Sequence, residues 1–152
     1  MKRTTLLLIM LLGGMFGANA QFDLSRVSEW TTVNSTMQYK LSYVYTDCNI
    51  PSEGLFAEYV LLRFENTSKE KLEISWYNDT YYDGKCTNCD HTKRDTKRTI
   101  VLAPGEVAQG KCAIGLNIGL RVHSKWTQMS GYPELETLKV TDVQVKPVVG
   151  NE

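Results

Sequence analysis

Four cysteines are the side chains in this chain that are best suited to chemistry. Cys86 and Cys89 are separated by two residues and His91 follows closely, whereas Cys48 and Cys112 stand alone. Thiols at such spacings can pair as disulfides, bind a soft metal ion or take part in thiol exchange. An even number of cysteines in an exported chain favours disulfides. We therefore expect two disulfides.

Two alternatives use the same cysteines. Cys86, Cys89 and His91 form a possible set of zinc ligands, which Cys48 or Cys112 would complete to a tetrahedron. A thiol oxidoreductase is the other alternative, and basic neighbours of the Cys-x-x-Cys pair would favour a thiolate. Such a motif usually needs a helix start behind it to lower a thiol pKa, and the polar residues that follow Cys89 offer no apolar helical face.

The start of the chain indicates export. A basic beginning is followed by an apolar run over 6–16, and Ala18 and Ala20 precede Gln21. This is the pattern of a cleavable signal peptide over residues 1–20, and the run is shorter than the ~20 residues that span a bilayer as a helix. No cysteine follows the expected cut to carry a lipid anchor. We expect a secreted or periplasmic protein without membrane insertion of the mature chain.

Length and charge limit the functions to consider. Removing 20 of the 152 residues leaves 132, which is enough for one domain, 21–152. The whole chain has 17 basic and 17 acidic residues. This balance provides no long-range attraction to nucleic acid, so we expect no nucleic-acid partner.

Hydrophobic alternation predicts an all-β fold. Apolar residues recur with period two, which is typical of half-buried strands, and Trp76 is the expected core residue of its strand. The phase of the last strand breaks near Thr141, which predicts a β-bulge. We expect seven to eight strands in a single antiparallel β-sandwich, at about 27–33, 37–45, 55–65, 72–77, 100–102, 106–111, 116–122 and 138–145.

Two turn motifs carry a resemblance. The segments 64–68 (FENTS) and 102–106 (LAPGE), together with the signal peptide and the Cys-x-x-Cys loop, resemble uncharacterised small secreted bacterial proteins with an immunoglobulin-like domain. The resemblance implies a fold and a compartment. The chain departs from a true immunoglobulin domain because Gly110 stands two residues before Cys112, where a corner tyrosine would be expected.

The expected strand order also predicts how the cysteines pair. If each strand crosses the domain, the loops at 47–54, 83–97 and 112–115 share one end, and those at 66–70, 103–105 and 125–136 share the other. All four cysteines would then lie at one end. This makes Cys48–Cys112 and Cys86–Cys89 plausible disulfides, while the other two pairings remain open.

The leading functional hypothesis is a non-enzymatic module that binds a protein or a glycan. No nucleophile elbow and no phosphate-binding glycine motif occurs in the sequence, and we expect no cofactor. Trp126 and Tyr132 lie in a long predicted loop and are the candidate contact residues, because exposed aromatic side chains are typical of recognition surfaces. The rival hypothesis is a cysteine-centred metal-binding or thiol-redox function.

Overall fold

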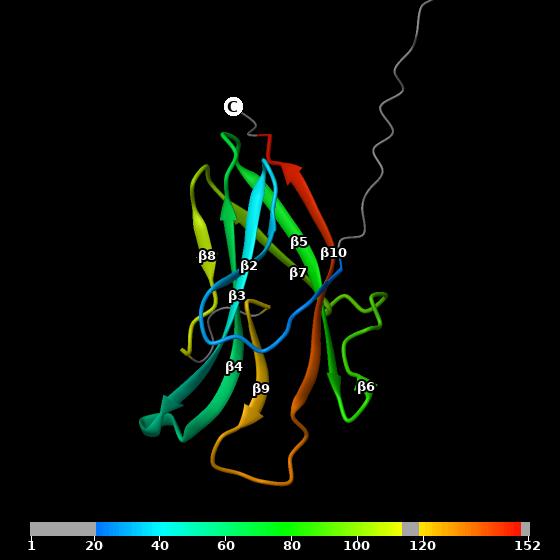
Figure 1. Ribbon diagram of the computed structural model, residues 1–152. Helices are drawn as coiled ribbons and strands as arrows, with labels where there is room; N and C mark the ends of the chain where they lie inside the picture. The colour runs from blue at the N-terminus through cyan, green and yellow to red at the C-terminus, as the bar shows by residue number, and fades with distance from the viewer. Residues whose placement is uncertain (1–20, 114–118, 150–152) are drawn as a thin grey trace, which may run out of the picture.

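The computed structural model describes residues 21–113 and 119–149, so the predicted signal peptide and the first three residues of the predicted strand at 116–122 lie outside the described residues. The described chain is all-β and forms two antiparallel sheets (Figure 1). Its only helix is a single 3-10 turn, η1 (Pro51–Glu53). Accordingly, no described helix has the length and apolar character that a membrane span requires.

In each sheet, two short strands pair one after the other along the same edge of a long strand. The first sheet has the order β1 (Phe22–Asp23), β10 (Leu135–Pro147), β5 (Leu72–Tyr82), with β6 (Lys85–Cys86) and β7 (Lys97–Leu102) both pairing with β5. The second sheet has the order β2 (Thr31–Ser35), β3 (Tyr39–Ile50), β4 (Leu55–Asn66), with β8 (Val107–Gln109) and β9 (Arg121–Trp126) both pairing with β4.

The core lies between the two sheets. Alternate residues of β3 and β4 pack against alternate residues of β5 and β10 in one hydrophobic cluster. Trp76 is fully buried at its centre, and its ring lies 4.6 Å from that of Phe64 on the opposite sheet. The prediction that Trp76 is a core residue is therefore confirmed.

Two local predictions have opposite outcomes. The bulge expected near Thr141 is confirmed, since the β10–β5 register shifts between Thr141 and Gln144 and Asp142 has a φ of 49°. The strand predicted from Met37 begins instead at Tyr39, and Met37 is 92% exposed. The Thr36 hydroxyl accepts hydrogen bonds from the backbone amides that follow, which holds this position in a turn.

The predicted position of the loop at 125–136 is wrong. β8 and β9 both run antiparallel to β4, with Val107 opposite Glu65 and Trp126 opposite Ala57. β8 and β9 therefore lie one after the other along the same edge of β4. Both strands run in the same direction, so the chain does not reverse between them. As a result, the β9–β10 loop lies at the same end as η1, where the Thr127 amide donates to the Phe56 carbonyl at 3.0 Å (Figure 1).

A second hydrophobic cluster covers the outer face of the second sheet. It contains Cys48, which is 1% exposed and lies within β3, not in the loop predicted at 47–54. The period-two alternation continues through this position to Ile50, and the turn begins at η1. Trp30 and Trp126 pack against the same cluster.

Candidate functional site

The structure joins the cysteines in two pairs. The Cα atoms of Cys48 and Cys112 are 5.3 Å apart, and those of Cys86 and Cys89 are 5.8 Å apart, within the range that a disulfide spans. The first pair ties the chain after β8 to the outer face of the second sheet. The second closes a four-residue clip at the end of β6, so the two pairs belong to different sheets.

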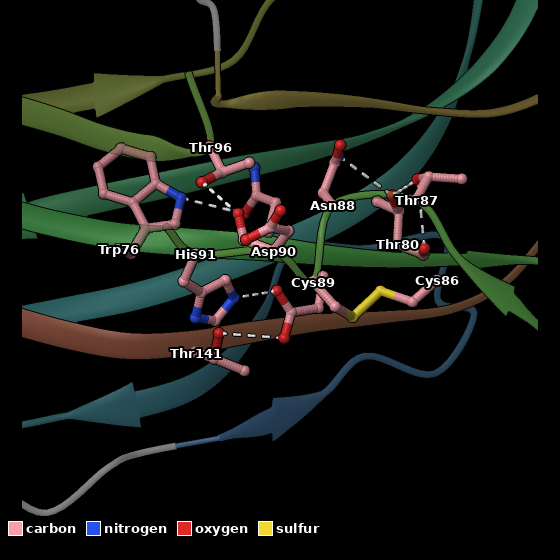
Figure 2. A network of polar contacts seen from close by, with 12 residues as sticks. Trp76, Thr80, Cys86, Thr87, Asn88, Cys89, Asp90, His91, Thr96 and Thr141 are labelled. Atoms are coloured by element: carbon pink, nitrogen blue, oxygen red, sulfur yellow. Dashed lines mark hydrogen bonds and ion pairs between the residues drawn. A yellow bond between two sulfur atoms is a disulfide. The ribbon is translucent and has the colours of Figure 1, made fainter. Parts of the chain in front are cut away.

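The clip presents its two enclosed residues to β5. The Thr87 amide donates to the Thr80 carbonyl at 2.9 Å, and the Thr80 and Thr87 hydroxyls are hydrogen-bonded to each other. The Asn88 side-chain amide donates to the Thr80 hydroxyl at 3.2 Å. Figure 2 shows this group beside the disulfide formed by Cys86 and Cys89. A disulfide that closes a loop of four residues thus fixes two polar side chains against a buried strand.

The same loop crosses to the opposite face of β5. His91 Nε2 lies 2.6 Å from Asp79 Oδ1, and the imidazole stacks on the Tyr77 ring with 4.0 Å between the ring centres. His91 is therefore held by β5. No group of three or more metal-ligating side chains gathers within residues 21–113 and 119–149, so the alternative site of Cys86, Cys89 and His91 is not assembled in this structure.

A polar pocket opens between the two sheets where the clip approaches β9. Its volume is about 210 Å³, and all but two of its lining residues have polar side chains. The walls come from β5, from the loop between β6 and β7, from the start of β7 and from the edge strand β9. The lining residues are Asn78, Thr80, Tyr82, Thr87, Asn88, Thr96, Arg98, Gly119, Arg121, Val122 and His123.

Hydrogen bonds hold the inner wall in place. Asn78 accepts from the Trp76 indole at 3.0 Å and donates to the Gly119 carbonyl at 2.7 Å. The Tyr82 hydroxyl donates to the backbone carbonyl of His123 in β9. Burial, with a smaller contribution from Tyr45, raises the pKa of Tyr82 to about 12, so this hydroxyl keeps its proton at neutral pH. The wall connecting the two sheets is consequently formed before any ligand arrives.

Two arginines are among the residues that line the pocket. The Arg121 guanidinium donates to the Cys112 and Ala113 carbonyls and lies 4.6 Å from the Tyr59 ring centre. Arg98 is half-buried and makes no ion pair with another described residue. No carboxylate is among the described residues that line the pocket. Arg98 is thus the cation best placed to meet a ligand.

The two predicted contact residues lie in different environments. Trp126 ends β9 and packs against the outer cluster, 4.8 Å from the His123 ring. Burial lowers the pKa of that imidazole. Tyr132 is 57% exposed and shares its loop with Met129, which is 48% exposed. The structure does not bring Trp126 and Tyr132 into one exposed patch.

Sequence reasoning missed the pocket residues. Thr87 and Asn88 were visible as the pair enclosed by the Cys-x-x-Cys motif, and Arg98 as a charge in phase with the core-facing residues Ile100 and Leu102. No family model matches the chain, and neither the curated proteins nor the solved structures contain a significant match to it. The geometry of the site is therefore the basis for any functional proposal.

Proposed function

We propose that this chain is an exported, non-enzymatic immunoglobulin-like β-sandwich that binds one sugar unit of a glycan in the pocket between its sheets. The observation that carries the proposal is the lining of that pocket, which is almost wholly polar and is held by hydrogen bonds among its own residues. A sugar presents hydroxyl groups on every side and needs donors and acceptors that are already in position.

The size of the pocket supports a small ligand. Its volume of about 210 Å³ lies below the roughly 300–1,000 Å³ of pockets that enclose drug-sized molecules. A single sugar ring, or the terminal ring of a longer chain, suits this space. The two facing antiparallel sheets support the sandwich, although Cys48–Cys112 ties the chain after β8 to the outer face of one sheet and is no counterpart of an antibody's inter-sheet disulfide.

Export is the second part of the proposal. It rests on the signal pattern at residues 1–20 and on two cysteine pairs at disulfide distance, since disulfides persist in oxidising compartments. In this account the Cys86–Cys89 clip has a structural task. It keeps Thr87 and Asn88 in the pocket wall, and it takes no part in thiol exchange.

A panel of methyl glycosides, measured by saturation-transfer NMR, tests the proposal. The wild-type protein should give transfer signals with some members of the panel, and Asn88→Ala should weaken binding about fivefold because it removes one wall hydrogen bond. Asn49→Ala is the matched control, since Asn49 is exposed on β3 and its loss should change nothing. Absence of signal across the panel, or equal losses for both variants, would contradict the proposal.

A second candidate function uses the β9–β10 loop. Met129 and Tyr132 are both exposed there, and the Gly84 amide donates to Glu136 at 3.0 Å beside the loop. An apolar and aromatic pair at one end of a domain suits contact with a protein partner. The double variant Met129→Ser/Tyr132→Ser should leave glycoside binding unchanged, so the two candidates can be distinguished.

A further inference from the structure

We infer that the sugar recognised in the pocket carries a carboxylate, and that Arg98 binds it. This inference rests on the proposed function and names the class of ligand. The first observation is the position of Arg98 in β7. Ile100 and Leu102 point from the same strand into the core between the sheets. Arg98 precedes them at the same two-residue spacing, so its side chain is directed to the same face of β7, where it lines the pocket.

Gly119 fixes the path of the Arg98 side chain. A Cβ atom at position 119 would lie 2.6 Å from Cδ of Arg98 and 2.7 Å from its Cγ, so the aliphatic stem fills the space that a larger residue would occupy. Gly119 has a φ of +94°, which L side chains rarely adopt. The guanidinium is therefore held at the pocket by packing of its stem.

The charge of Arg98 is not balanced within the described part of the pocket. Arg121 adds positive charge of its own, directed to backbone carbonyls. Asp90, in the loop between β6 and β7, accepts from the amide and hydroxyl of Thr92 and lies 3.6 Å from Lys93. A half-buried cation without a counter-ion is stabilised when an anion arrives.

The chemistry of the pocket then defines the anion. A guanidinium binds a carboxylate through two parallel hydrogen bonds, which are about twice as strong as neutral ones. Asn88 and Thr87, held by the clip as Figure 2 shows, supply polar atoms suited to the ring hydroxyls. A uronic acid combines both features in one ring, and its size suits a pocket of about 210 Å³.

Calorimetric titration with three related compounds tests the inference. Methyl β-glucuronide should bind at least tenfold more tightly than methyl β-glucoside, because the charged hydrogen bonds to Arg98 are gained only with the acid. The methyl ester of the glucuronide has nearly the same shape without the charge and should bind like the glucoside. This comparison uses the wild-type protein alone, so it does not depend on the folding of any variant.

Variants then assign the preference to Arg98. Arg98→Gln should reduce the preference for the acid to less than twofold, whereas Arg98→Lys should retain part of it. Arg94→Gln is the matched control for lost charge, since Arg94 is exposed in the loop that leads into β7, and it should retain the full preference.

The outcomes separate this inference from the proposed function. Equal affinities for glucuronide, its ester and glucoside would overturn the role of Arg98 while leaving sugar binding intact. If none of the three binds, the proposed function itself fails. Inorganic sulfate that binds as tightly as the glucuronide would identify a simple anion site and would also overturn the inference.

Discussion

The two disulfides should contribute to different properties of the protein. Cys48 and Cys112 are 64 residues apart in sequence, and a disulfide closing such a loop stabilises the fold by about 4 kcal/mol through the entropy of the unfolded chain. Cys86 and Cys89 are 3 residues apart, for which the same relation gives about 2 kcal/mol. The first value is a large share of the 5–15 kcal/mol that typically stabilises a domain.

Binding should show the opposite order. The clip encloses Thr87 and Asn88, whose contacts with Thr80 form part of the pocket wall. The Cys48–Cys112 pair lies on the outer face of the second sheet, within the outer cluster. Cys86→Ser/Cys89→Ser should therefore weaken glycoside binding about tenfold, since two wall hydrogen bonds lose their support. Cys48→Ala/Cys112→Ala should leave binding within twofold wherever the protein remains folded.

Urea unfolding followed by circular dichroism measures the first effect, and calorimetric titration below the unfolding transition measures the second. Mass determination before and after reduction and alkylation establishes which pairs are present in each sample. The reasoning is refuted if the clip variant loses more stability than the Cys48–Cys112 variant. It is also refuted if loss of the clip leaves affinity unchanged.

Three further changes test single features of the structure. Burial lowers the pKa of His123 from its ordinary value of 6.5, so the folded state should lose stability as pH falls below that value, and His123→Gln should flatten this part of a stability–pH profile. Asn66→Ala removes the donor to the Leu102 carbonyl at 3.0 Å and should cost about 1–3 kcal/mol in urea unfolding because a buried acceptor loses its partner. Gly119→Ala should displace the Arg98 stem and so reduce the calorimetric preference for glucuronide.

Much of the fold could be predicted because its signals are local. Alternation along β4 and β5 places Phe64 and Trp76 in the core, and the phase break in β10 locates the bulge after Thr141. Each of these depends only on which face of a strand a residue occupies. That information is present in the sequence wherever one face is buried.

The arrangement of the strands depends on partners that are distant in sequence. β8 and β9 pair with successive parts of β4 in the same direction, so counting strands from end to end misplaces the loop between β9 and β10. The pocket likewise depends on residues that are distant from one another in sequence. Asn88 belongs to the first sheet's loop and Val122 to the second sheet's edge, and no local pattern indicates that they line one cavity.

Mapping the ligand on the protein tests the central claim most directly. A ¹H–¹⁵N correlation spectrum of the exported protein, recorded during titration with methyl β-glucuronide, reports which residues the sugar contacts. We predict saturable shifts concentrated at Thr80, Asn88, Arg98 and Val122, which line the pocket. Shifts confined to the loop around Tyr132, or no saturable shifts, would contradict the assignment of a sugar-binding site to the pocket between the sheets.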